Sequence, residues 1–195
     1  SSNPAVASVN ASTGLVTGVA AGSATITYTA SGPCGSSVAT AAITIHALPD
    51  AGTLSGSASV CAGSSTSFTS NGDGGGTWIS NNSSVATVDP ATGAISGVAG
   101  GSTTITYTVI NGCGTATATR VITVIPLPDA GTVTGAASVC VDGHVTYTSD
   151  GLSGGIWSSN NTSAATVDPA SGLVTGVSAG NATITYTVTT GCGTT

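Results

Sequence analysis

The sequence predicts an all-β protein built from tandem β-sandwiches, and three observations lead to that prediction. The stretch from Trp78 to Tyr107 returns 79 residues later, as Trp157 to Tyr186, without insertion or deletion. Short runs with alternating apolar and polar residues are separated by glycine clusters, Asp-Pro pairs and Asn-Asn pairs. No segment has the apolar period of a helix. A fixed period indicates repeats in tandem, and short strands without helices indicate a β-sandwich in each repeat.

Charge and hydropathy exclude several classes of protein. Among 195 residues there is one cation, Arg120, against seven Asp, for a net charge of −6. Nucleic acid binding needs clustered Lys and Arg, so we expect no nucleic acid partner. No apolar run approaches the ~18 residues that span a bilayer. Neither a signal peptide nor an initiating Met is present, so we expect a mature segment of a longer polypeptide.

The repeat period divides the chain into five parts. Residues 1–46 form the C-terminal half of a repeat, here called the first repeat segment, and 47–51 are a linker. Residues 52–125 are a complete repeat, 126–130 a second linker, and 131–195 a third repeat without its last strand. Both linkers contain Leu-Pro-Asp-Ala, and proline fixes φ. We therefore expect short, stiff connections between the repeats.

The second repeat contains about seven predicted strands at the spacing typical of a sandwich. Along one of them Ile105, Tyr107 and Val109 alternate with threonines, so these three are expected to point inward. Ile122 and Val124, like Ile43 and Ile45 in the first segment, mark the inner face of the final strand. The predicted strands are Thr53–Ser59, Thr66–Ser70, Thr77–Ser80, Val85–Asp89, Ala94–Val98, Thr103–Ile110 and Ala116–Ile125.

The motif WSSNNTSAATVDPASGLVTGVSAGNATITY, with its counterpart after Trp78, resembles the bacterial immunoglobulin-like domain of group 2. The resemblance implies immunoglobulin-like sandwiches in a linear rod, as in large bacterial surface adhesins. Val-Cys at 60–61, Asn-Gly-Cys-Gly at 111–114 and the PLPDAG linker are similar to giant secreted repeat proteins of the Bacteroidetes type. Exposed tryptophans that stack on sugars are the alternative to a core role. The expected core residues are Trp78, Trp157, Tyr28, Tyr107 and Tyr186.

No residue pattern predicts catalysis, a cofactor or a metal. His46 and His144 occupy different positions of the repeat, so neither belongs to a recurring dyad or triad. Asp89-Pro90 and Asp168-Pro169 are typical of turns capped by the Asp side chain. The linkers offer Asp50 and Asp129, one carboxylate each, whereas calcium prefers several. We expect a protein that is not an enzyme.

The five cysteines recur at matching positions of the repeats, which indicates disulfides and an oxidising compartment. Pairing within a repeat would join 61 to 113 and 140 to 192; pairing across a linker would join 34 to 61 and 113 to 140. Strand order favours a third choice. The first turn and the last hairpin of a sandwich lie at opposite ends, and a seven-residue strand spans roughly 23 Å, so Cys61 and Cys113 of one repeat are expected to lie too far apart to bond. Cys61 would then meet Cys192 of the next repeat, leaving Cys113 and Cys140 to pair outside this segment. These alternatives remain open for Cys34, Cys61, Cys113, Cys140 and Cys192.

These features predict an extracellular structural protein, a stalk or filament on the cell surface. Its partners would be other copies of the repeat, end to end and possibly side by side. The units could belong to one continuous chain or could be completed by strands from neighbouring chains. The alternative function is an adhesin module that binds host protein or glycan, but the loops at 71–76 and 150–155 lack aromatic and basic residues.

Overall fold

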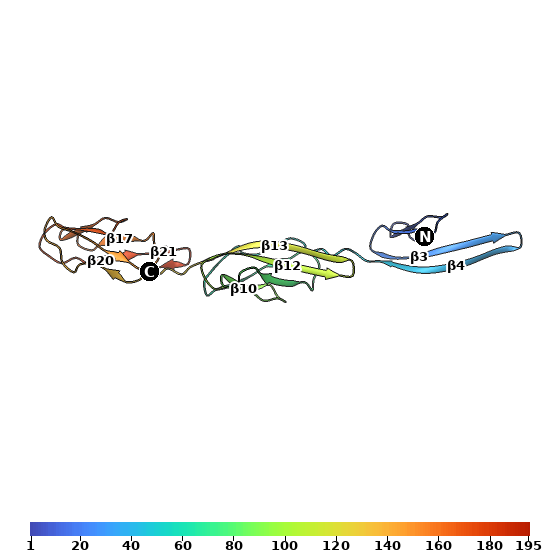
Figure 1. Cartoon of the computed structure of the whole chain (residues 1–195), viewed down its shortest axis with the longest axis horizontal. Coiled ribbons are helices and arrows are strands. Elements are labelled where there is room, and N and C mark those ends of the chain that lie inside the picture. Colours follow the sequence, from blue (N-terminus) through green and yellow to red (C-terminus); the bar gives the residue numbers. More distant parts are fainter. The chain divides into compact units, whose positions relative to one another are not determined.

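The computed structural model describes every residue from Ser1 to Thr195, and its secondary structure consists of strands without a helix (Figure 1). The predicted all-β class is therefore confirmed. No helix in it could cross a membrane. Contacts divide the chain into two compact units, one formed by 1–55, 69–78 and 106–119 and the other by 56–68, 79–105 and 120–195. The division passes through strands of the second repeat.

Two sheets and a short ribbon make up the second repeat. The first sheet is antiparallel, in the order β10 (Ala86–Val88), β11 (Ala94–Gly97), β7 (Ser65–Ser67). The second has the order β6 (Ser59–Cys61), β13 (Gly114–Ile125), β12 (Gly101–Asn111), β9 (Thr77–Ser80), and β12 and β13 appear side by side in Figure 1. Strand β6 runs parallel to the end of β13, so that Cys61 lies opposite Ile125. The ribbon pairs β5 (Leu54–Ser55) with β8 (Thr69–Ser70).

The core of this repeat draws on both sheets. Its largest fully buried side chains are Phe68, Ile95, Ile105, Ile122 and Val124. On β12 the inward side chains alternate as expected, because Tyr107 and Val109 are also buried while Thr104, Thr106 and Thr108 are half-buried. Branched apolar side chains on one face of a strand remove apolar surface from water and leave the threonines to the solvent side.

Two predicted strands are each broken in the structure. The range Thr53–Ser59 is wrong as one strand, since β5 ends at Ser55 and β6 begins at Ser59. Gly56 between them has a φ of +130° and lies so close to Ser67 and Phe68 that a side chain would collide with the Ser67 carbonyl. The range Thr66–Ser70 is likewise split at Phe68 into β7 and β8, which pair with different partners. The chain changes sheets at both points.

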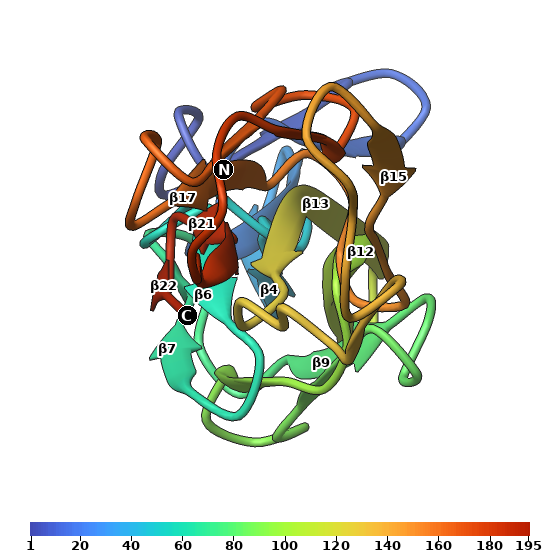
Figure 2. The same cartoon turned by 90° about the vertical axis from the view of Figure 1, so that its left-hand side faces the viewer.

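The third repeat follows the same plan. One sheet has the order β15 (His144–Thr146), β19 (Leu173–Gly176), β18 (Ala165–Val167), and β17 (Ile156–Ser159) pairs with β20 (Ile184–Thr187). Strand β14 (Val133–Thr134) pairs with β16 (Thr148–Ser149). A tight hairpin of β21 (Thr189–Thr190) and β22 (Gly193–Thr194) is drawn in red in Figure 2. Residues 138–140, the counterpart of β6, are not in a strand.

The first repeat segment consists of two hairpins. Strand β1 (Ala7–Val9) pairs with β2 (Val16–Gly18), and β3 (Gly22–Gly32) pairs over its whole length with β4 (Gly35–Ile45), the long blue hairpin of Figure 1. Its small core contains Val6, Ala7 and Ala24, with Val16, Ile43 and Ile45 packed against it.

The expected core role of Tyr28 is wrong, because this side chain is 70% exposed. In the second repeat Tyr107 is buried because its ring lies 4.5 Å from that of Trp78, centroid to centroid. The position 79 residues before Trp78 falls ahead of residue 1, and within residues 1–195 no aromatic ring packs against Tyr28. Trp78 and Trp157 are each only 6% exposed, and Tyr186 is half-buried at 4.6 Å from Trp157.

Candidate functional site

The second half of each linker is fixed by hydrogen bonds to the repeat that follows. In the first linker the Asp50 carboxylate accepts the Gly52 amide at 2.8 Å, and the Asp50 amide donates to the Asp73 carboxylate at 2.9 Å. The Asp50 carbonyl accepts the Asp73 amide at 2.7 Å, and the Thr53 amide donates to the Asn71 side chain at 2.7 Å. Linker and loop are thus joined at several points, as a stiff connection requires.

The second linker repeats this arrangement. The Asp129 carboxylate accepts the Gly131 amide at 2.9 Å, and its carbonyl accepts the Leu152 amide at 2.8 Å. Asp150, in the position of Asn71, accepts the Thr132 amide at 2.6 Å. Gly131 has a φ of +61° and passes so close to the backbone of Gly151 that a side chain would collide with it. We call the hydrogen bonds between each linker and the loop of the following repeat the linker clamp. The part of it made by the side chains of Asn71 and Asp150 was not predicted, although both residues carry a side-chain oxygen at the same repeat position.

A disulfide joins the second and third repeats. It links Cys61 to Cys192, whose Cα atoms are 5.8 Å apart across a sequence separation of 131. Cys61 ends β6 beside Ile125, and Cys192 lies in the turn between β21 and β22. The Cys192 sulfur is 3.7 Å from the Ile125 carbonyl oxygen. The hairpin turn of the third repeat therefore lies against the end of the second, which is the pairing that strand order favours.

The equivalent hairpin turn of the second repeat lies against the end of β4 in the same way, but without a disulfide. The thiol of Cys113 is 3.8 Å from the His46 carbonyl oxygen, and the Asn111 side chain donates to the Ala47 carbonyl at 3.1 Å. A cavity of about 240 Å³ adjoins this contact, lined by His46, Ala47, Asn111 and Gly112. Cys113 is free and exposed, as are Cys34 and Cys140. None of the other pairings considered from the sequence is present.

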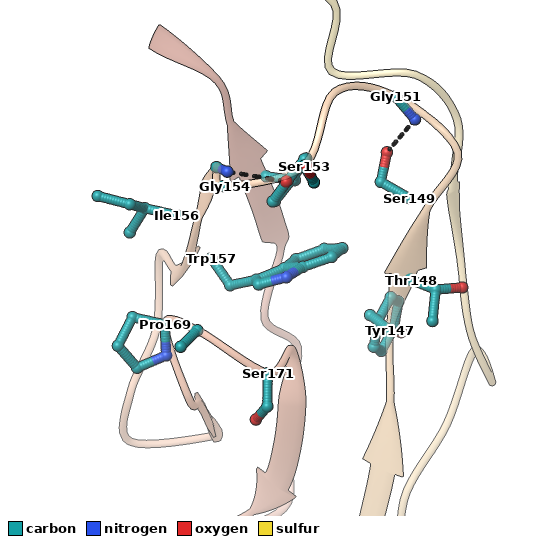
Figure 3. A pocket seen from close by; sticks show the side chains of 13 residues that line it. Tyr147, Thr148, Ser149, Gly151, Ser153, Gly154, Ile156, Trp157, Pro169 and Ser171 are labelled. Carbon is teal, nitrogen blue, oxygen red and sulfur yellow. Dashed lines mark hydrogen bonds between the residues drawn. The ribbon is translucent and has the colours of Figure 1, made fainter.

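The third repeat contains an open pocket of about 600 Å³ beside Trp157. Figure 3 shows the Trp157 ring at its centre, with Tyr147 to its right, Pro169 to its left and Ser171 below it. Such a hollow with an aromatic floor is the place where a stacked sugar would be sought. The pocket is the candidate for the adhesin alternative.

Several polar side chains around this pocket have hydrogen-bond partners within the chain. The Tyr186 hydroxyl donates to the Leu152 carbonyl at 2.9 Å and accepts the Gly155 amide at 2.9 Å, and the Tyr147 hydroxyl donates to the Ala136 carbonyl at 2.8 Å. Ser149 donates to the Ala130 carbonyl, and Ser171 donates to the Asp168 carboxylate at 2.7 Å. These hydrogen bonds engage the hydroxyl groups of Tyr147, Ser149, Ser171 and Tyr186 within the chain.

The remaining candidate residues hold turns. The Asp89 carboxylate accepts the Thr92 hydroxyl and amide, both at 2.7 Å, and the hydroxyl contact leads the hydrogen bonds that lower the pKa of Asp89. At Asp168 the Ser171 amide is the main cause of the lowered pKa, followed by the Ser171 hydroxyl. Asn10 caps the corresponding turn in the first segment. His144 has Thr175 as its partner, at 2.9 Å.

One functional contact was missed because it depends on tertiary structure. Arg120, the single cation, donates to the Gly56 carbonyl at 3.0 Å, and its guanidinium carbon lies 5.3 Å above the centre of the Phe68 ring. It thereby joins β13 to the point where the chain changes sheets between β5 and β6. No repeat pattern could have indicated this, since the first segment has Ala41 at the position that matches Arg120.

The chain is similar to solved structures of the surface-layer protein SbsC, domains 1–6 (16% identity over 94% of this chain and 35% of that one, TM-score 0.32). It is also similar to a SusE-like surface-located polysaccharide-binding protein from the Bacteroides thetaiotaomicron heparin utilisation locus (15% identity, 87% and 32%, TM-score 0.32). The chain spans about a third of the length of these structures. At such TM-scores nothing about function follows.

No curated protein matches the sequence. The family of the bacterial Ig-like domain (group 2) matches at residues 1–41, 39–120 and 127–195, which is nearly the whole chain. The matches recur once in each of the three repeats, as the resemblance of the Trp78 and Trp157 motifs predicts. The chain belongs to the bacterial Ig-like domain family, group 2, as a tandem array of its members.

Proposed function

We propose that this chain is a segment of an extracellular structural protein, a stalk or filament at the cell surface whose repeats transmit force rather than perform chemistry. The observation that carries this proposal is the Cys61–Cys192 disulfide, which bonds one repeat covalently to the next. Disulfides persist in oxidising compartments, which supports a location outside the cytoplasm. A bond between repeats resists their separation under load, a property that a single binding domain does not need.

The linker clamps support the same function. Hydrogen bonds from Asp50 and Asp129 to the following repeat restrict the hinge that a Gly- or Ser-rich linker would provide. Proline at 49 and 128 removes further freedom from each linker. Stiff connections between equal units favour an extended array over a collapsed one.

The near absence of charge supports a role in assembly. With one cation and seven Asp, most of the surface consists of Ser, Thr, Gly and small apolar side chains. Where such surfaces pack together, few charged side chains have to be removed from water. Copies could therefore pack end to end or side by side. Neither catalysis nor a cofactor is part of this proposal.

Negative-stain electron microscopy of the purified chain tests the proposal. We expect extended particles in which three repeats follow one another, and we expect particles of the Cys61→Ser variant to bend more at the second junction. The Cys113→Ser variant is the matched control, because it removes a thiol from the equivalent position without breaking a disulfide. Compact particles, or a chain that binds a glycan array through the Trp157 pocket, would contradict the structural role and favour an adhesin.

A further inference from the structure

The turn between β12 and β13 contains a site for spontaneous chemical modification. Asn111-Gly112 in this turn is one of two Asn-Gly pairs in the chain, and Asn71-Gly72 is the other. In such a pair the backbone nitrogen of the glycine attacks the side-chain carbonyl carbon of the asparagine, because glycine has no side chain to obstruct the approach. The two pairs differ in how firmly the structure holds the glycine.

Gly112 is unrestrained, whereas Gly72 is held in place. The Gly112 amide donates to no group of the chain, and a side chain built on this residue would meet nothing within 4 Å. The Gly72 amide donates to the Ser70 hydroxyl at 3.0 Å in a partly buried hydrogen bond, and a side chain on Gly72 would collide with the Asp50 carbonyl. The Gly72 nitrogen must therefore lose a hydrogen bond and its packing before it can attack, and the Gly112 nitrogen need not.

The carbonyl that is attacked is polarised in both pairs. The Asn111 side-chain oxygen accepts the Cys113 amide at 2.8 Å, and the Asn71 oxygen accepts the Thr53 amide at 2.7 Å. Each of these donors points at the oxygen on which negative charge develops during the attack. The glycine is thus the feature that separates the two sites. We propose that Asn111 deamidates spontaneously in the folded chain and that the surroundings of Gly72 protect Asn71.

The reaction needs only water as a co-reactant. The Gly112 nitrogen forms a bond with the Asn111 Cγ, its proton passes to Nδ2, and ammonia leaves as the bond between Cγ and Nδ2 breaks. The product is a five-membered succinimide ring. Water then opens this ring at one of two carbonyl carbons: cleavage at Cγ gives aspartate, and cleavage at the backbone carbonyl gives isoaspartate. No group is oxidised or reduced.

Deamidation changes the first junction and spares the second. The Asn111 Nδ2 donates to the Ala47 carbonyl of the first linker at 3.1 Å, an exposed contact that water can replace during the reaction. The new carboxylate cannot donate, so two acceptors would face each other at this place. In the third repeat the equivalent residue is Thr190, whose hydroxyl accepts the Cys192 amide at 3.1 Å and which carries no amide to lose. The first junction would therefore loosen with age, whatever function the array has.

Incubation of the purified chain in warm, mildly alkaline buffer tests the modification. Peptide mapping by mass spectrometry, with an isoaspartate-specific methyltransferase to label isoaspartate, follows both asparagines in one sample. We expect Asn111 to deamidate about tenfold faster than Asn71, the effect on a rate of one hydrogen bond that only Gly72 must lose. In denaturant both glycines are released, and the two rates should converge. Equal rates in the folded chain, or a faster rate at Asn71, would overturn the proposal.

The consequence for the junction is tested with Asn111→Asp, which carries one product from the start. We expect hydrogen–deuterium exchange of residues 46–50 to become severalfold faster than in the unaltered chain, and exchange of residues 125–129 to stay the same. Asn71→Asp is the matched control and should leave both segments unchanged, because Asp150 already makes the same contact in the second linker. Unchanged exchange at 46–50 in Asn111→Asp would refute the effect on the junction.

Discussion

Cys61 is bonded to Cys192 although a nearer cysteine of its own repeat, Cys113, follows it in the chain. The reason is the direction of the strands. Cys61 ends β6, which runs parallel to the last residues of β13, so it lies at the end of the second repeat from which the linker leaves. Cys113 lies in the turn between β12 and β13, so the 12 residues of β13 separate it from the end of the repeat at which Cys61 lies. The bond therefore forms across a junction rather than within a sandwich.

Loss of this bond should destabilise the third repeat. Cys192→Ser removes the disulfide, and we expect the free energy of unfolding to fall by about 2–4 kcal/mol. Denaturant unfolding followed by tryptophan fluorescence measures this, since Trp157 lies in that repeat. Cys113→Ser, at the equivalent position but without a disulfide, should change stability by less than about 0.5 kcal/mol. Equal effects of the two substitutions would mean that the bond does not hold the repeat.

Tyr107 should contribute to stability through its hydroxyl, and Tyr28 should not. The Tyr107 hydroxyl donates to the Asp73 carbonyl at 2.8 Å and accepts the Gly76 amide at 3.0 Å. Tyr107→Phe leaves both backbone groups without this partner, so we expect a loss of about 1–3 kcal/mol in denaturant unfolding. Tyr28→Phe at the exposed counterpart is the control and should be near neutral. A comparable loss for Tyr28→Phe would contradict the different surroundings of the two rings.

The sequence predicts the regular parts of this fold well because they are local. Alternation of Ile105, Tyr107 and Val109 with threonines is sufficient to define one face of β12, and the 79-residue period is sufficient to define the repeats. The chain changes sheets at Gly56 and Phe68, and these points depend on how two strands approach each other. Because each lies inside a continuous run of strand-forming residues, the sequence pattern does not predict the break.

Equality of sequence also misled at one position. Tyr28 occupies the same repeat position as Tyr107 and Tyr186, but those two rings pack against Trp78 and Trp157, and the equivalent position for Tyr28 falls ahead of residue 1. The linker clamp and the Arg120 contact were invisible for a similar reason, since both join residues distant in sequence. Strand order could indicate the pairing of Cys61 with Cys192 across the junction, because it determines at which end of a sandwich each turn lies.

Arg120 should stabilise the second repeat through its contacts with Gly56 and Phe68. Arg120→Met removes the hydrogen bond to the Gly56 carbonyl and the cation above the Phe68 ring. We expect a loss of about 1–3 kcal/mol in thermal or denaturant unfolding. Arg120→Lys keeps the charge but not the planar guanidinium, so its stability should lie between those of the unaltered chain and Arg120→Met. A neutral Arg120→Met would show that the contact contributes nothing.

Acid should weaken the turns at Asp89 and Asp168. Hydrogen bonds lower the pKa of each carboxyl in the folded chain below its ordinary value of 3.8. A lowered folded pKa means that the stabilisation is complete above that ordinary value and is lost as pH falls through the folded pKa. Asp89→Asn with Asp168→Asn keeps the turns, as Asn10 does, without titrating. The melting temperature of this variant should therefore fall less between about pH 5 and pH 2.5 than that of the unaltered chain. Parallel decreases would contradict the assignment.

Trypsin offers the most direct test that consecutive repeats are bonded to each other, because Arg120 is its only cleavage site. The folded chain should resist cleavage, since Arg120 lies within β13. After alkylation of free thiols and denaturation without reduction, cleavage should give fragments 1–120 and 121–195 that stay joined, with Cys34, Cys113 and Cys140 alkylated. Reduction should then separate them. Two fragments that separate before reduction would contradict the bond between repeats.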